Sequence, residues 1–164
     1  SETGISIMQL DAQMDAGPIY TQHRHPLTST ETKPQLYDEL FAAGSDLLVR
    51  TLPSILAGTL QPTPQNDAEA TYCQLLSKEM SLIDPMAMTA TAADAHVRAY
   101  LGFPRSRLRI HDRELIITKT RVSDAPESPL SVKCRDGRYI TILELIAPSG
   151  KKMAAEAFLR GHQN

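Results

Sequence analysis

The 164-residue chain contains no tryptophan, and aromatic residues make up only 5% of it. Its core must therefore rest on leucine, isoleucine, valine, alanine and methionine. The two cysteines, Cys73 and Cys134, belong to no CxxC or Cys/His cluster, which favours two free thiols over a disulfide framework. No apolar run approaches the roughly 18 residues of a membrane-spanning helix, and no basic-then-apolar secretory signal opens the chain. We expect a cytoplasmic protein that does not engage a membrane.

Charge is distributed unevenly, although the net charge is only -2. Residues 1–85 carry four basic and eleven acidic side chains, whereas residues 86–164 carry thirteen basic and eight acidic ones. The first part therefore has a net charge of -7 and the second a net charge of +5. A basic half indicates an anionic ligand, most often nucleic acid, although a modest excess of charge is also typical of a solvated surface.

The N-terminal part predicts the end of an α/β unit. Residues 4–10 and 18–25 favour strands, and residues 11–17, rich in Asp, Gly and Ala, favour a loop. A helix is expected over residues 30–43, and Gly44 is expected to interrupt it before a second helix that ends at Gly58. Two strands cannot make the sheet that two such helices would cover, so we expect further sequence before residue 1.

A different pattern follows residues 60–70, whose prolines and amides are typical of a linker. Thr89–Tyr100 predicts a helix, Asp136-Gly137 predicts a hairpin turn, and His111–Arg113 a tight connection. Short strands linked by turns are typical of a small barrel. The remaining expected elements are strands at 107–110, 115–122, 130–134 and 139–147 and a helix at 154–159.

The loop at residues 11–17 is the first candidate site. It follows the C-terminal end of a predicted strand, where open α/β sheets bind ligands. Asp15 lies in it, and Gly17 would allow a ligand to approach the backbone closely. Asp-x-Gly is also common in turns, so Asp15 may equally bond only to its own loop.

These residues carry a family resemblance. Residues 4–19 follow the pattern Gly-x-Ser-Ile-x-Gln-x-Asp-x-x-Met-Asp-x-Gly-x-Ile, which resembles the signature shared by glycinamide-ribonucleotide and methionyl-tRNA formyltransferases. Leu76-Ser77-Lys78-Glu79, Arg98-Ala99-Tyr100 and residues 148–153 resemble later segments of the methionyl-tRNA formyltransferases. The resemblance spans essentially the whole chain. It departs at Pro85 and residues 102–104, where the family usually has tryptophan.

The resemblance implies an α+β protein in two parts. Residues 1–60 would be the C-terminal part of a formyltransferase catalytic domain, residues 61–85 an interdomain linker, and residues 86–164 an OB-like barrel that binds tRNA. The implied reaction transfers a formyl group from 10-formyltetrahydrofolate to the amine of methionyl initiator tRNA. No metal is implied, and a monomer is expected.

Site residues are implied in the same way. Asp15 matches the catalytic aspartate of the family, and the loop that would bind folate contains Asp11, Gln13, Met14 and Gly17. The family also uses an Asn-x-His pair to bind the oxyanion. Neither asparagine of this chain precedes a histidine by two residues. We therefore expect part of an enzyme that is inactive by itself.

Basic residues of the second half are candidates for tRNA phosphates. Arg105, Arg107 and Arg109 alternate, which would place them on one face of a strand. A solvated barrel face would carry such residues equally well. The full set of candidates is Arg98, Arg105, Arg107, Arg109, Lys119, Lys133, Arg135, Arg138, Lys151 and Lys152.

Other interpretations remain open. A sugar-nucleotide formyltransferase would share the chemistry and a similar small domain, and a non-catalytic RNA-binding module would share the basic half. His23 and His25 would lie on one strand face as a possible metal pair, but the sequence offers no recognisable third ligand. His96, His111 and His162 are expected on the surface or on a helix face.

Overall fold

A computed structural model describes residues 1–110 and 113–161 of the chain. They form two compact units, Ser1–Gln74 (unit 1) and Leu75–Asn164 (unit 2). Among the described residues, no helix is long and apolar enough to cross a membrane. The connection expected at His111 and Asp112, and the histidine at 162, lie outside the described residues.

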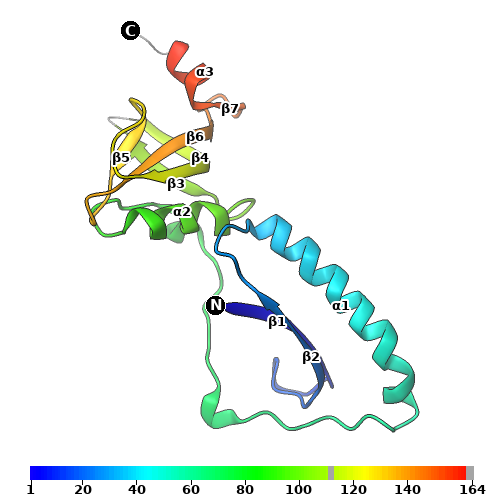
Figure 1. The fold of residues 1–164 in the computed structure, drawn as a ribbon. Coiled ribbons are helices and arrows are strands. Elements are labelled where there is room, and N and C mark those ends of the chain that lie inside the picture. The colour runs from blue at the N-terminus through cyan, green and yellow to red at the C-terminus, as the bar shows by residue number, and fades with distance from the viewer. Residues whose placement is uncertain (111–112, 162–164) are drawn as a thin grey trace. The chain divides into compact units, whose positions relative to one another are not determined.

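Unit 1 consists of a hairpin and one long helix (Figure 1). Strands β1 (Glu2–Met8) and β2 (Ile19–Pro26) confirm the two predicted strands and pair antiparallel. Helix α1 (Lys33–Leu56) lies along this hairpin. A short 3-10 helix, η1 (Asp67–Glu69), follows in the segment expected to be a linker.

Helix α1 corrects the prediction of two helices. It begins after Thr32, whose backbone N–H and hydroxyl both donate to Gln35 Oε1, at 3.1 and 2.7 Å. It then continues through Gly44 and Pro53. A β-carbon on Gly44 would lie 3.0 Å from Ile5 Cγ2 of β1. Glycine in a helix costs about 1 kcal/mol but does not end it, and here it allows the helix to approach the hairpin closely.

Unit 2 is a mixed α/β fold around a curled antiparallel sheet (Figure 1). The strand order is β3-β4-β6-β5, and β7 also pairs with β6. Strand β7 was not predicted, because three residues carry too little periodicity to be detected. The elements are η2 (Lys78–Ser81), α2 (Ala90–Ala99), β3 (Ser106–Ile110), β4 (Arg113–Ser123), β5 (Ser131–Lys133), β6 (Tyr139–Ile146), β7 (Lys152–Ala154) and α3 (Ala155–Arg160).

The predicted hairpin turn at Asp136-Gly137 is confirmed. Gly137 has a φ of 82°, in the left-handed region that favours glycine. Arg138 O accepts a 2.8 Å hydrogen bond from Cys134 N–H, and the strands on either side are β5 and β6. Asp136 also accepts a bond from Ala90 N–H at 3.1 Å, so the turn is tied to the first residue of α2.

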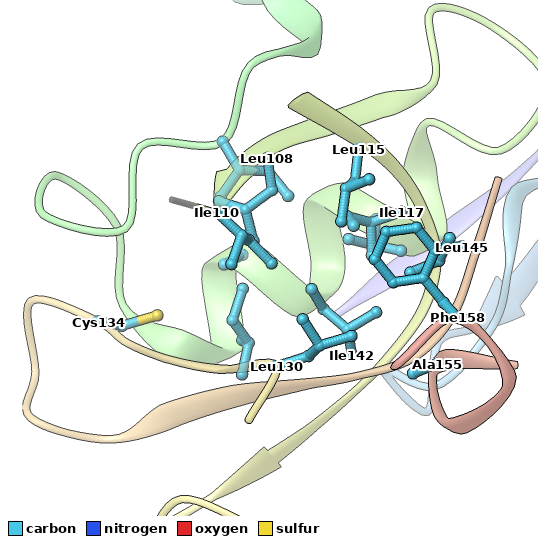
Figure 2. Packing of buried hydrophobic residues seen from close by; sticks show 14 of the residues in the cluster. Leu108, Ile110, Leu115, Ile117, Leu130, Cys134, Ile142, Leu145, Ala155 and Phe158 are labelled. Carbon is cyan, nitrogen blue, oxygen red and sulfur yellow. The ribbon is translucent and has the colours of Figure 1, made fainter. Parts of the chain in front are cut away.

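The hydrophobic core lies in unit 2. Figure 2 shows Ile117 and Leu145 beside Phe158 of α3, with Leu108 next to Ile110 in the same cluster. Leu108, Ile117 and Leu145 come from three strands and are at most 1% exposed. Helix α2, in the segment where a helix was predicted, adds Ala90, Ala93 and Val97. The core contains mainly aliphatic residues, as the lack of tryptophan required.

Candidate functional site

The loop at residues 11–17 connects β1 to β2. Gln9 N–H donates to Pro18 O at 2.9 Å, which closes the base of the loop. Asp11 Oδ1 accepts from Gln13 N–H at 3.0 Å, an Asx turn that shapes its first half. All residues from Asp11 to Ala16 are exposed. The loop is thus a closed projection from the hairpin, and its side chains face solvent.

Asp15 has a left-handed backbone conformation. Its φ is 56°, in the left-handed region, which aspartate tolerates better than most residues. Its carboxylate has no hydrogen bond or ion pair to any residue of the described ranges, so it does not merely bond to its own loop. An exposed carboxylate of this kind can order a water molecule or accept a proton.

Gly17 is the one buried residue of the loop. A β-carbon there would lie 1.8 Å from Gln9 O, so no other residue fits without moving the backbone. We predicted that this glycine lets a ligand approach the backbone. The structure supplies a different reason for it, namely the tight closure of the loop base.

Sequence reasoning missed Gln65. Its Nε2 donates to Asp15 O at 2.7 Å and to Gly17 O at 2.8 Å, across about fifty residues of sequence. Two further bonds, Ile19 N–H to Thr63 O and Thr63 N–H to Ile19 O, both at 2.8 Å, hold the segment against the start of β2. The sequence showed only linker composition here, because a contact over such a separation leaves no local pattern.

The other candidate residues of the loop are exposed. Gln13 and Met14 are both exposed, Met14 to 92%. Their proposed contacts to folate would come from the backbone, and the structure neither adds nor removes a side-chain partner for them. They remain candidates by family resemblance.

The arginines at 105, 107 and 109 do not form one strand stripe. Arg105 precedes β3 and has a φ of 69°, and its Nε donates to Gly102 O at 3.3 Å. Arg107 is held by Glu114 at 2.8 Å and by Ser81 Oγ at 2.7 Å. Arg109 is exposed. The prediction of a shared face is wrong for Arg105, because the chain turns there before the strand begins. It holds for Arg107 and Arg109, which lie on the face of β3 opposite to its buried residues.

Ion pairs divide the remaining basic candidates of unit 2. A cation that already faces a carboxylate offers less charge to a phosphate. Arg109, Lys119, Lys133, Arg135 and Lys151 are exposed, and no residue of the described ranges forms an ion pair with them. The paired candidates are Arg98 with Asp94, Arg138 with Asp124 and Lys152 with Glu144, each at 2.9 Å.

The sequence suggested His23 and His25 as a possible metal pair. His25 Nε2 lies 3.3 Å from Glu39 Oε2 of α1, while His23 is exposed. Residues 1–110 and 113–161 contain no group of three or more His, Cys, Asp or Glu side chains that could hold a metal.

His96 is half-buried rather than a plain surface residue. Its Nε2 faces Met80 O and its Nδ1 faces Ser106 Oγ, each at 2.9 Å. Burial lowers its pKa. The imidazole thus links η2, α2 and β3 within unit 2.

Comparisons with known proteins extend over the whole chain. Residues 1–52 match the family model described as formyl transferase, and residues 75–163 match the one described as formyl transferase, C-terminal domain. A methionyl-tRNA formyltransferase of Roseiflexus castenholzii is 37% identical over 93% of this chain and 51% of its own length. The chain therefore spans about half the length of the curated relatives it matches.

Solved structures share the fold. HypX from Aquifex aeolicus in complex with tetrahydrofolic acid superposes with a TM-score of 0.70 at 17% identity, over 96% of this chain and 30% of that one. An N-formyltransferase from Helicobacter canadensis, in complex with folinic acid and dTDP-3-aminofucose, superposes with a TM-score of 0.66 at 19% identity. That match covers 86% of this chain and 55% of the other.

Proposed function

Because the chain belongs to the formyltransferase family, we propose that it is part of an enzyme that formylates the amine of methionyl initiator tRNA. The observation that carries this proposal is the 37% identity to a protein named methionyl-tRNA formyltransferase over 93% of the chain. The exposed Asp15, in a closed loop within the family signature, supports it.

The formyl donor would be 10-formyltetrahydrofolate, which supplies an activated one-carbon group. Tetrahydrofolic acid and folinic acid in the two solved structures support a folate. Asp11, Gln13, Met14 and Gly17 are the loop residues that would lie along it. No metal is part of this proposal.

Asp15 would manage protons during the transfer. When the amine nitrogen bonds to the formyl carbon it must lose a proton, and the departing folate nitrogen must gain one. The Asp15 carboxylate can accept the first proton, or hold a water that carries it. Donors for the developing oxyanion are needed as well, and no Asn-x-His pair occurs in this sequence. The assay therefore calls for the longer protein that carries this chain.

Unit 2 would hold the tRNA. We assign residues 1–60 to the catalytic domain, residues 61–85 to the linker, and residues 86–164 to an OB-like barrel. The curled antiparallel sheet and the +5 charge of residues 86–164 support this assignment. The exposed cations without ion pairs are the strongest candidates for phosphate contacts. The enzyme would act as a cytoplasmic monomer.

The test is turnover of 10-formyltetrahydrofolate with methionyl-tRNA by the longer protein. Asp15→Asn keeps the size of the side chain but removes its charge, so we expect a loss of about 10²- to 10⁴-fold, with tRNA binding retained. Asp46→Asn, an exposed change in α1, is the charge-matched control. Activity of Asp15→Asn within a few-fold of the parent would contradict the role of Asp15.

Substrate choice is tested in the same assay. The Helicobacter canadensis structure makes an amino sugar linked to a nucleotide the relevant competitor. We expect turnover with methionyl-tRNA and none above background with dTDP-3-aminofucose. The reverse result would favour a sugar-nucleotide formyltransferase, and tRNA binding without turnover of either substrate would favour a binding module.

A further inference from the structure

Two carbonyl groups of the loop that bears Asp15 point at one side chain. Asp15 O and Gly17 O accept hydrogen bonds from the same Gln65 Nε2, at 2.7 and 2.8 Å. No backbone amide of the described residues donates to either oxygen. The carboxamide therefore bridges the positions on both sides of Ala16, and it supplies both protons of its NH₂ group.

The segment that carries Gln65 is itself anchored. Thr63, two residues earlier, exchanges two 2.8 Å hydrogen bonds with Ile19 at the start of β2. Asn66, the next residue, caps η1 by accepting from Ala68 N–H at 3.2 Å. Backbone bonds before Gln65 and a side-chain cap after it thus fix where its amide can reach.

The loop needs such a support. The bond from Gln9 N–H to Pro18 O closes its base and the Asx turn of Asp11 shapes its first half, but the left-handed Asp15 has no backbone bond of this kind. A bidentate donor on Asp15 O and Gly17 O restrains rotation of the peptides on either side. The direction of the Asp15 side chain follows from those peptides.

We propose that Gln65 is a positioning residue, which fixes the loop at residues 11–17 so that the Asp15 carboxylate is held ready for formyl transfer. Gln65 does not touch the reacting atoms in this proposal, and acts only through the loop backbone. The expected effect on kcat rests on the proposed function. The two hydrogen bonds from Gln65 to Asp15 O and Gly17 O, here called the clamp, are a property of the chain itself.

The first measurement is amide hydrogen exchange on the 164-residue chain and on the longer protein. Gln65→Leu keeps the bulk of the side chain and removes both donors. Loss of two net hydrogen bonds should loosen the loop and speed exchange of its hydrogen-bonded amides, those of Gln9 and Gln13, by about tenfold or more, with the amides of β1 and β2 unchanged. The matched control is Gln61→Leu, because Gln61 Nε2 makes only a local 2.7 Å bond to Gly58 O. Equal exchange in the parent and Gln65→Leu would overturn the clamp.

The second measurement is a double-mutant cycle in the formyl-transfer assay. We expect Gln65→Leu to lower kcat by about tenfold, within the range that small misplacements of catalytic groups produce, and to leave KM for methionyl-tRNA unchanged. In the Asp15→Asn background the same change should have no further effect on kcat. An additive loss would show a merely structural role and overturn the positioning proposal.

The two measurements separate the possible failures. If Asp15→Asn remains active, the proposed role of Asp15 is lost, and exchange alone decides the clamp. If Asp15→Asn is inactive while Gln65→Leu retains the parent kcat, the proposed function stands and the positioning role is wrong. Gln65→Glu gives an independent check, because an ionised carboxylate cannot donate to either carbonyl and should reproduce the defect of Gln65→Leu.

Discussion

Units 1 and 2 are of similar length but are stabilised differently. Every residue of the hydrophobic core cluster belongs to unit 2, whereas the 24-residue helix α1 of unit 1 has no buried residue. Large apolar side chains of α1 are instead exposed, among them Phe41 at 78% and Leu56 at 79%. In unit 1, order comes from the hairpin ladder, the capped helix and the hydrogen bonds of Thr63 and Gln65.

The difference shows that the strands and the helix of unit 1 form without a hydrophobic core like that of unit 2. The backbone groups of a hairpin and of a helix form hydrogen bonds within each element, but two strands and one helix bury little apolar surface. The unit with the candidate catalytic residue is thus the one with the weaker core. Experiments that treat the units separately should show this directly.

Separating the units should give the largest effect. We expect residues 75–164 to unfold cooperatively on heating, with a free energy of unfolding near the lower end of about 5–15 kcal/mol for small domains. Residues 1–74 should show no cooperative transition, because α1 buries no residue. Far-UV circular dichroism melts of both segments and of the whole chain decide this. A sigmoidal melt of residues 1–74 would contradict the expected difference in cooperativity between the two units.

Matched truncations should reproduce the difference within the intact chain. Leu145 in β6 is 0% exposed and Leu48 in α1 is 42% exposed. We expect Leu145→Ala to lower the free energy of unfolding by about 2–5 kcal/mol. Leu48→Ala should change it by no more than about 0.5 kcal/mol. Urea denaturation followed by circular dichroism gives both values, and equal losses would contradict a core confined to unit 2.

The basic residues of unit 2 allow a functional test, in which cations with and without an ion pair are compared in tRNA binding. We expect Arg109→Ala with Lys151→Ala to weaken tRNA binding and to flatten the slope of log affinity against log salt by up to about two contacts, each near 0.7–0.9. Arg138→Ala with Lys152→Ala also removes two positive charges, but from side chains paired with Asp124 and Glu144. This double variant should flatten the salt slope less. Identical slopes in both double variants would show that ion pairing does not select the phosphate contacts.

The smallest expected effect is a pH dependence of unit 2. Burial lowers the pKa of His96 below its ordinary value of 6.5. As the pH falls below about 6.5 the unfolded chain takes up the proton first, so stability is complete above this value and is lost towards the lower folded pKa. Urea midpoints of the whole chain between pH 8 and 5 should show this loss. His96→Gln should flatten it, while the exposed His23→Gln should leave it unchanged.

Local patterns were sufficient for most elements. The strands β4 and β6, the turn at Asp136-Gly137 and helix α2 were all predicted, because each depends on neighbours within a few residues. The loop at residues 11–17 was placed correctly for the same reason. The two-helix prediction failed because Gly44 ends a helix in some contexts and permits close packing in others.

The sequence by itself therefore determined the local elements, the family and the loop that contains Asp15. Only the tertiary structure decided that Ile5 packs against Gly44 in one continuous α1, and that some cations are neutralised while Arg109 and Lys151 remain available. It also placed Gln65 on the Asp15 loop. Each of these depends on side chains that meet across long stretches of chain, and periodicity and composition describe only what lies nearby.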